Sequence, residues 1–527
     1  MRAIDPPRDR TIAQPGLAPS APAGEAMEAL LQLGYGAVAR GERARAAAIL
    51  DRVARERPDQ PHPCAGLARA LPKVPRSRIV EQFRASLRLA PDDLRLCEAY
   101  AGFLLDGDQA EQALPVLHSW LERQPNAAAA HTMAGIALNA LGRFGAALDH
   151  LQCAVSLAPG QAACWANLGM LLKTVGDFRP ALNAYAEAVA RDPDNPRLRV
   201  NRAVALLHAG CWPEAWTDYE YRLLLPGRHA LAGLGPLLPT LSPTVSLEGR
   251  SVLVTHEEGF GDTIQFARYV PLLAQHGARV LVWVPAPLER LFAPLPGIAE
   301  LLVGNLPVPP HDFHCPMLSL PRAFGATTAT VPNAPYLRPA ADLVAAWAGR
   351  VPRDGLRVGL AWAGQSRPWL PDFAALDRRR SAGLAALAPL AAVPGIRLVS
   401  LQTGPAAAEA AAPPARLQVD DHSTALTDFA ETAALIANLD LVISVDTAVV
   451  HLAGAMGKPV FLLDRYDNCW RWLSGRADSP WYPSMTIFRQ SQPGDWTEPV
   501  SRAAAALEAM ALFRGAEQAR VLPAGQA

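Results

Sequence analysis

The sequence predicts two successive folds: an all-α array of helical hairpins, then an α/β module of two doubly wound parallel sheets. Three observations support this prediction. Prolines recur at a near-constant spacing in the first half, and short runs of Val, Ile and Leu alternate with helical segments in the second half. A stretch rich in Pro, Leu and Gly, 226–247, lies between the halves and is predicted to be a linker. With 527 residues, the chain is long enough for two or three domains.

The first half carries an internal repeat. Successive prolines lie 33, 34, 34 and 34 residues apart, at Pro58, Pro91, Pro125, Pro159 and Pro193. This period is that of tetratricopeptide repeats, in which each unit is a pair of antiparallel helices. The clearest unit, 162–193, has large and small residues in the expected order, at Trp165, Leu168, Gly169, Leu172, Ala181, Tyr185 and Ala188. Small residues allow the two helices to approach closely, and the proline marks the end of the second helix.

The repeats are predicted to span 26–225 as five to six units, after a disordered leader over 1–25. The last unit has no closing proline in register. We expect it to cap the array and pack on the next domain. Such an array is usually an interaction surface, which predicts a protein partner or acceptor on the repeats. A structural spacer or a self-association element is the alternative.

The second half is predicted to form two Rossmann-like halves, 248–335 on the acceptor side and 355–515 on the nucleotide side. Its apolar runs lack polar alternation, as expected of parallel strands that are covered on both faces. The predicted strands are Ser251–Thr255, Arg279–Val284, Glu300–Val303, Arg357–Trp362, Ile396–Leu401, Leu439–Ser444, Pro459–Leu463 and Met485–Phe488. Two such halves make a cleft, and ligands bind at the carboxyl ends of its strands.

Composition excludes several classes of partner. Lys plus Arg and Asp plus Glu both number 49, so nothing favours nucleic acid or an anionic membrane as the main partner. The seven cysteines are scattered and never form C-x-x-C, which is typical of a reducing compartment and predicts a cytoplasmic protein. The early arginines precede no apolar segment, so neither a signal peptide nor a transmembrane segment is expected.

The first candidate site follows the first predicted strand, in the segment Val254-Thr-His-Glu-Glu-Gly-Phe-Gly-Asp-Thr-Ile264. Gly259 and Gly261 permit a tight turn and a close backbone approach before a helix. Neither the third glycine of a dinucleotide fingerprint nor the lysine of a P-loop is present. Asp262 is a candidate general base at the mouth of the cleft. The alternative is that it only caps the helix.

The second candidate site follows the strand that ends at Ser444. The next residues open a helix whose free N–H groups suit a diphosphate, and they are Asp446, Thr447, Ala448, Val449 and His451. Asp446 would repel phosphate, so we expect it to bind sugar hydroxyls or to cap the helix. A lone histidine such as His451 is more often a packing residue than a ligand.

A third candidate combines the turn after Trp362 with a cluster of arginines that includes Arg379 and Arg380. These cations could neutralise phosphate, and a solvated basic loop is the alternative. His311, His314 and Cys315 are possible metal ligands, but prolines flank them and no further Cys/His pair is near. No metal is therefore expected there.

Taken together, Gly261–Ile264 and the run Ser444–Gly454 resemble glycosyltransferase family 9, the heptosyltransferases, in a form fused behind tetratricopeptide repeats. The resemblance covers about 249–496 and implies a GT-B fold and inverting, metal-independent transfer from a nucleotide-sugar donor. It implies that Asp262 is the catalytic carboxylate and that 446–451 form the donor loop. It also implies that Arg379 or Arg380 meets the diphosphate. The family often has Gly where this chain has Ala448.

The sequence therefore predicts a glycosyltransferase that needs no metal or other cofactor, with an acceptor hydroxyl that a protein held by the repeats could carry. Two alternatives stay open. One is a non-catalytic scaffold with a degenerate transferase domain. The other is a lipopolysaccharide-core heptosyltransferase with accessory repeats, which differs in its acceptor. The repeat-plus-transferase arrangement is also similar to that of the O-linked N-acetylglucosamine transferases, where the solenoid presents protein substrates.

Overall fold

The computed structural model describes residues 76–226, 234–242, 245–304, 307–367, 371–414 and 417–521, with scattered positions between 29 and 53. The predicted leader, 1–25, and Pro58 lie outside the described residues. The chain divides into two units, 1–137 and 138–527, of which the second contains both sheets and the later repeat helices. Each unit is described by itself.

The helices follow the predicted period. The first helices of successive hairpins are α5 (Leu94–Asp106), α7 (Ala128–Ala140), α9 (Ala162–Thr174) and α11 (Pro196–His208). The second helices are α6 (Ala110–Arg123), α8 (Phe144–Leu157), α10 (Phe178–Arg191) and α12 (Trp212–Tyr219). Within each series, successive helices begin 34 residues apart, which confirms the predicted all-α repeat fold. One further helix, α4 (Arg76–Leu89), precedes α5 in the first unit.

Close packing within the hairpins follows from small residues. A Cβ placed on Gly169 would lie 3.1 Å from the Tyr185 ring, and Ala181 is fully buried. The turns that join the paired helices contain Gly142, Gly176 and Gly210, whose φ angles are 71°, 84° and 78°. Because this left-handed conformation favours glycine, the repeat carries its turn signal in the sequence.

The first sheet has four parallel strands in the order β3-β2-β1-β4. They are β1 (Ser251–Thr255), β2 (Arg279–Val284), β3 (Ile298–Val303) and β4 (Phe313–Pro316). The sequence did not predict β4, because only four residues form it and prolines surround it. In this strand His314 is fully buried, and its Nε2 is 2.9 Å from Thr255 Oγ1.

Helices of the first Rossmann-like half connect these strands and flank the sheet. They are α14 (Phe260–Phe266), α15 (Val270–Gln275), α16 (Glu289–Phe292) and α17 (Leu320–Ala323). Part of the predicted linker also packs here, since the Leu238 N–H donates to the His314 carbonyl at 2.8 Å and Leu238 is fully buried.

The second sheet has six parallel strands in the order β10-β9-β8-β5-β6-β7. They are β5 (Leu356–Ala361), β6 (Ile396–Ser400), β7 (Val419–Asp420), β8 (Leu441–Val445), β9 (Val460–Asp464) and β10 (Met485–Arg489). The chain adds strands on one side of β5 and then on the other. The strand order therefore reverses between β5 and β8, where doubly wound sheets bind ligands.

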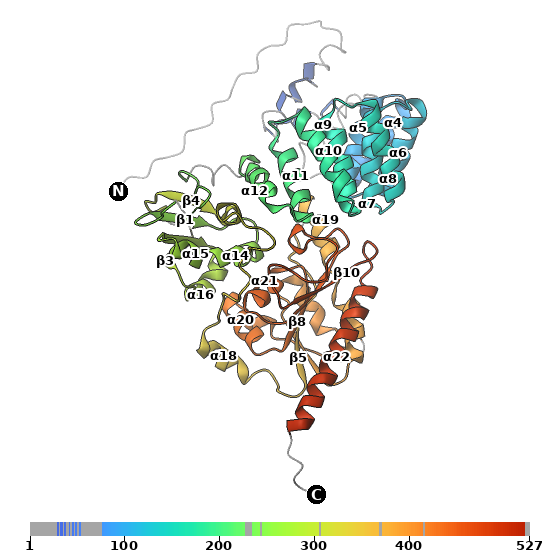
Figure 1. Cartoon of the computed structure of the whole chain (residues 1–527). Coiled ribbons are helices and arrows are strands. Elements are labelled where there is room, and N and C mark those ends of the chain that lie inside the picture. The colour runs from blue at the N-terminus through green and yellow to red at the C-terminus, as the bar shows by residue number, and fades with distance from the viewer. Residues whose placement is uncertain are drawn as a thin grey trace, which may run out of the picture. The chain divides into compact units, whose positions relative to one another are not determined.

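Helices cover this sheet on both faces, as expected of a buried parallel sheet (Figure 1). They are α18 (Ala341–Ala348), α19 (Pro371–Arg380), α20 (Phe429–Ala437), α21 (Ala448–Ala455) and α22 (Thr497–Val521). Short 3-10 turns such as η8 (Trp470–Trp472) complete the connections. The two parallel α/β sheets confirm the predicted double-Rossmann architecture. No helix within the described ranges is both long and apolar enough to cross a membrane.

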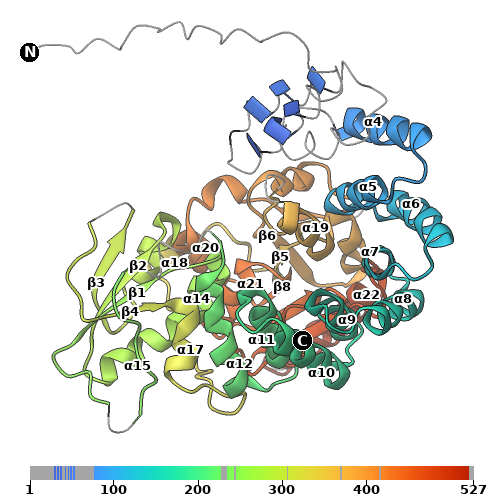
Figure 2. The ribbon, with the colours of Figure 1, turned by 90° about the horizontal axis from the view of Figure 1, so that it is seen from above.

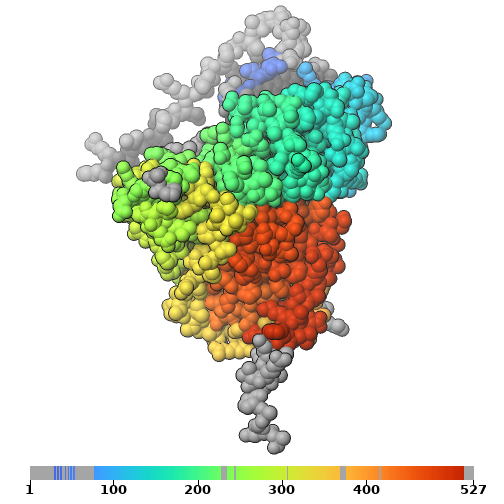
Figure 3. Space-filling model, in the orientation of Figure 1, coloured from blue at the N-terminus to red at the C-terminus, as the bar shows by residue number. Residues whose placement is uncertain are grey.

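Within the second unit, the last repeat hairpin is built into the α/β module. Trp212 stacks on Trp481 with ring centroids 4.7 Å apart, and Trp216 meets Trp470 edge-on at 5.8 Å. Just beyond the hairpin, buried Arg222 pairs with Glu257 at 2.6 Å. In the space-filling view the green surface of the last repeat helices borders the orange-red surface of the second sheet's domain (Figure 3). The contacts of Trp212 and Trp216 confirm the expectation that the last repeat packs on the next domain.

Candidate functional site

Asp262 lies in the first turn of α14, three residues after the helix cap. Gly259 is the cap residue, with φ −94° and ψ 171°. Asp262 Oδ2 accepts a hydrogen bond from the Gly259 N–H at 3.0 Å. Asp262 is thus not the cap itself but the reciprocal partner of the cap backbone. Its Oδ2 oxygen therefore has a structural role, and 18% of the Asp262 side chain stays exposed.

Gly261 brings α14 against α21, so the two Rossmann-like halves meet at the two helix starts (Figure 2). A Cβ placed on Gly261 would lie 2.8 Å from His451 Cδ2 and 3.4 Å from Ala448 Cα. Both glycines of the first motif therefore serve a close approach, and the second one lets Asp262 lie beside the predicted donor helix. Phe260 and Phe429, 5.2 Å apart, add a second contact between the halves.

The predicted donor loop joins β8 to α21. Thr447 caps α21, and its hydroxyl oxygen accepts from the Val449 N–H at 3.2 Å. Asp446, Thr447, Ala448 and Val449 are all half-buried. The first turn of α21 therefore presents backbone N–H groups at the strand-order reversal, on the edge that faces Asp262.

His451 is held by aromatic side chains. It is buried, its Nδ1 lies 3.1 Å from the Tyr482 hydroxyl, and its ring stacks on Trp472 at 5.1 Å. Burial, together with the nearby Arg471 cation, lowers the pKa of His451 well below its usual range. These are the contacts of a neutral packing histidine that fixes α21 in place.

Arg379 and Arg380 end α19 and both have acidic partners. Arg379 Nε lies 3.1 Å from Asp467 Oδ2, and Arg380 Nη2 lies 2.9 Å from Asp377 Oδ1. The Arg380 guanidinium covers Gly364, where a Cβ would collide with it, just beyond the end of β5. Arg380 thus lies beside the same edge as α21, whereas Arg379 is 53% exposed and pairs with a residue that follows β9.

The sequence analysis missed Arg471, which lies in η8 between β9 and β10. It forms an ion pair with Asp262 Oδ1, and its Nε donates to Gln265 Oε1 at 2.9 Å. Burial is the largest single influence and opposes its charge, but the Asp262 carboxylate, Cys469 and Tyr219 together outweigh burial and keep the pKa of Arg471 above its usual range. The sequence signal was the unusual Trp-Arg-Trp at 470–472.

A second polar cluster lies at the ends of β9 and β10. Asp464 is fully buried and pairs with Arg489 at 2.8 Å. Burial raises the pKa of Asp464 to about 6, although Arg489 opposes that shift. From the repeat helix α9, Lys173 faces this cluster, and burial lowers its pKa although Asp467 opposes the change.

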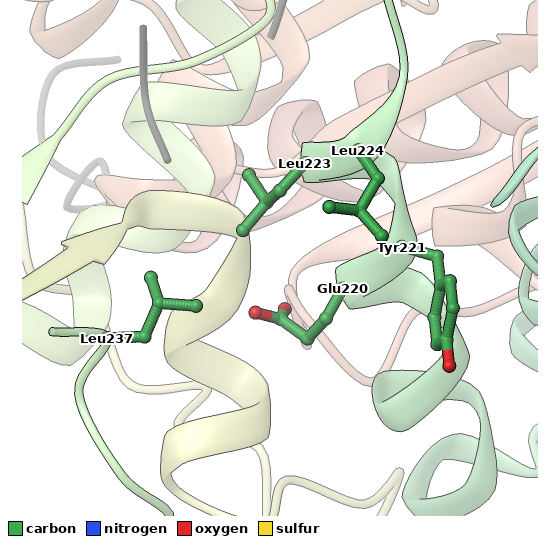
Figure 4. Close-up of a pocket in the computed structure, with 5 residues that line it drawn as sticks. All are labelled: Glu220, Tyr221, Leu223, Leu224 and Leu237. Atoms are coloured by element: carbon green, nitrogen blue, oxygen red, sulfur yellow. The ribbon is translucent and has the colours of Figure 1, made fainter. Parts of the chain in front are cut away.

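The open pocket nearest to the first sheet contains none of the predicted site residues. It has a volume of about 230 Å³ and is lined by Glu220, Tyr221, Leu223, Leu224 and Leu237. Figure 4 shows the Glu220 carboxylate between leucines from two segments. Because this carboxylate also binds Ser319 Oγ at 2.9 Å, it has a structural partner. The described residues contain no group of three or more His, Cys, Asp or Glu placed to hold a metal ion.

Known proteins resemble both halves of the chain. Residues 399–495 match the family model of glycosyltransferase family 9 (heptosyltransferase), and 111–206 match that of the ESX-1 secretion system protein EccA1, N-terminal domain. Over 485 residues the chain is 28% identical to Protein FlbA of Caulobacter vibrioides, covering 84% of this chain and 78% of that protein. The C-terminal half thus carries a glycosyltransferase family 9 domain behind repeats of tetratricopeptide type.

Solved structures also resemble the repeats. A tetratricopeptide-repeat protein of Thermus thermophilus is 25% identical, covering 34% of this chain and 99% of that one, with a TM-score of 0.31. PilF of Pseudomonas aeruginosa is 21% identical, covering 39% and 94%, with a TM-score of 0.33. MamA of Desulfovibrio magneticus is 22% identical, covering 33% and 98%, with a TM-score of 0.29.

Proposed function

We propose, from the family 9 domain at 399–495, that the chain transfers a sugar from a nucleotide-sugar donor to an acceptor hydroxyl. One observation carries the proposal: Gly261 places α14 directly against α21, so a carboxylate from one half borders the donor loop of the other. A base on one side and an anion-binding helix start on the other are the two parts that such a transfer requires.

The donor's diphosphate would lie on the first turn of α21, with Thr447 and Ala448 offering backbone N–H groups. The Val449 N–H is held by the Thr447 hydroxyl, and Val449 would border the ligand. Arg380 beside the end of β5 would add positive charge, and Arg379 would act at a longer range. Asp446 is placed to accept hydrogen bonds from sugar hydroxyls. In this proposal guanidinium and helix N–H groups stabilise the leaving diphosphate, without a metal.

Asp262 would act as the base. Its carboxylate accepts the proton of the acceptor hydroxyl while that oxygen attacks the anomeric carbon. The bond from the anomeric carbon to the diphosphate oxygen breaks on the opposite face, so the configuration inverts. Since 18% of the Asp262 side chain is exposed, the carboxylate is open to an incoming hydroxyl.

The repeats would recruit the acceptor, which we propose to be a protein. In the first unit, α4, α5 and α6 line a groove of about 600 Å³ whose walls mix cationic, polar and apolar side chains: Arg84, Leu87, Arg88, Tyr100, Glu111, Gln112, Pro115 and Val116. Such a lining suits a polypeptide segment. The scattered cysteines, which never form C-x-x-C, support a reducing, cytoplasmic location.

Calorimetry of the full chain against nucleotide sugars and nucleoside diphosphates, with EDTA present, tests the proposal. We expect one base and sugar to bind, and binding to weaken at least tenfold in Thr447→Val, which keeps the shape of the cap but removes its hydroxyl. Ser423→Ala is the matched control, because Ser423 lies in an exposed turn of the same domain and pairs only locally with Asp421. Failure of every ligand to bind folded protein would instead favour the scaffold alternative.

A further inference from the structure

The contact between Arg471 and Asp262 joins the two halves at the proposed site. We propose that this ion pair is exchanged on donor binding: the diphosphate takes the Arg471 guanidinium and thereby frees Asp262 to act as base. The inference rests on the proposed function and makes Arg471 a donor-binding residue that the sequence analysis did not identify.

Arg471 has donors to spare for a second anion. A guanidinium has five N–H groups. Among the described residues, three of them serve Asp262 Oδ1, Gln265 Oε1 and Cys469 Sγ. Two N–H groups are left, on a side chain that keeps 12% of its surface exposed. A planar guanidinium of this kind suits bidentate binding of phosphate.

The place of Arg471 also fits a diphosphate on α21. Its neighbour Trp472 stacks on His451 of that helix at 5.1 Å. Its ion-pair partner follows Gly261, whose added Cβ would be 3.4 Å from Ala448 Cα. Gln265, fully buried, has an amide Nε2 without a partner among the described groups, beside the guanidinium. The guanidinium thus lies beside the proposed base, and the residue next to it packs on the helix that carries the proposed phosphate site.

The exchange has a chemical consequence. While Asp262 is paired, one of its oxygens is engaged by Arg471 and the other by the Gly259 N–H. A diphosphate competes for the guanidinium with greater negative charge and more acceptor oxygens. Asp262 then loses its cationic neighbour and becomes a better proton acceptor only when donor is present. Acceptor deprotonation is in this way coupled to donor binding.

The repeat hairpin sets where Arg471 lies. The preceding residue, Trp470, packs edge-on against Trp216 and Tyr219 at 5.8 and 6.1 Å. Arg471 also lies over the Trp470 ring, 4.4 Å from its centroid. The Trp-Arg-Trp turn is thus held on one side by the repeats and on the other by His451.

The test is a double-mutant cycle on diphosphate affinity, measured by calorimetry of the full chain with ADP, UDP, GDP and pyrophosphate. Asp262→Asn should slow transfer about 10²–10⁴-fold yet bind the diphosphate about tenfold more tightly, because Arg471 is released. Arg471→Met should weaken binding, and Arg471→Lys should restore part of it. In the Arg471→Met background, Asp262→Asn should no longer tighten binding.

The cycle separates exchange from simple repulsion between Asp262 and phosphate. If Asp262→Asn tightens binding equally with and without Arg471, repulsion alone acts and the exchange is refuted. Unchanged affinity in Asp262→Asn refutes it too, while the proposed function stands. No diphosphate binding by the folded wild type refutes both. Arg476→Met is the matched control, since Arg476 pairs with Asp478 at 2.6 Å in the same loop and should leave affinity unchanged.

Discussion

Replacing Gly261 with alanine tests the contact on which the site depends. The added Cβ would lie 2.8 Å from His451 Cδ2, well inside van der Waals contact, and 3.4 Å from the Ala448 backbone. His451 cannot turn away easily, because Trp472 stacks on its ring and Tyr482 binds its Nδ1. The clash must therefore separate α14 from α21 or displace the aromatic cluster.

The expected size of the effect follows from two opposing contributions. Overpacking a tight contact destabilises by about 1–3 kcal/mol. Alanine is better than glycine within a helix by about 1 kcal/mol at most. We expect Gly261→Ala to lose about 1–2 kcal/mol in the free energy of unfolding, together with weaker nucleoside diphosphate binding, because the helix starts move apart.

Urea denaturation and calorimetry measure both quantities. Gly145→Ala in α8 is the matched control, since a Cβ there would meet no atom within 4 Å. It should leave stability equal or slightly higher. Combining Gly261→Ala with His451→Ala should cost less than the two separate losses added, because the second change removes the clashing ring. A Gly261→Ala protein as stable as wild type, with unchanged diphosphate affinity, would show that the helices do not meet as described.

Three further predictions concern the rest of the molecule. Trp216→Ala should lower the free energy of unfolding by about 3–5 kcal/mol in urea denaturation. The change leaves a cavity among the packed aromatic rings and removes the hydrogen bond from Trp216 Nε1 to the Ala326 carbonyl. A loss below about 1 kcal/mol would contradict the described packing of Trp216. Asp262→Asn should reduce transfer about 10²–10⁴-fold in a radiolabelled-sugar assay, and an unimpaired rate would exclude the base; it should also lower the melting temperature, because the buried Arg471 cation loses its carboxylate partner. Burial lowers the pKa of four described histidines below the value in an unfolded chain: His208, His256, His314 and His451. The unfolded state therefore binds more protons below about pH 6.5, and stability should fall as pH drops from 7 to 5. Urea denaturation midpoints measured between pH 7 and 5 check this. The raised pKa of Asp464 acts in the opposite sense and offsets only part of the loss. His208→Leu should reduce the slope of unfolding free energy against pH by about 1.4 kcal/mol per pH unit, and an unchanged slope would mean that His208 titrates normally.

The repeat half was predictable because its signals are local. The prolines and the turn glycines at Gly142, Gly176 and Gly210 act within a few residues, so the period appears in the sequence before any tertiary contact is known. The buried strands of the second sheet were equally readable, since apolar runs such as β8 are covered on both faces. The short strand β4 was not, because four residues beside prolines carry no periodicity.

The candidate site was predictable only in part. Asp262 and the α21 loop stand in motifs that join a strand to a helix, so their neighbours in sequence are also their neighbours in space. Arg471 follows Asp262 by 209 positions. It reaches the site through a short turn whose place depends on tertiary packing. Its local signal is limited to the flanking Trp470 and Trp472. The sequence instead favoured Arg379 and Arg380, which the structure pairs with Asp467 and Asp377.

The packing of the last hairpin limits how the repeats and the transferase can vary independently. Trp212 and Trp216 contact Trp481 and Trp470, and Trp470 adjoins Arg471. A change in the final repeat would therefore move a residue of the proposed donor site, whereas a change in the groove lined by Arg84 and Tyr100 would not touch any of these contacts. Exchanging the helices before α7 should alter partner choice with diphosphate affinity preserved. Exchanging α11 and α12 should alter partner choice and diphosphate affinity together, because Trp216 and Tyr219 of α12 pack on Trp470, the neighbour of Arg471.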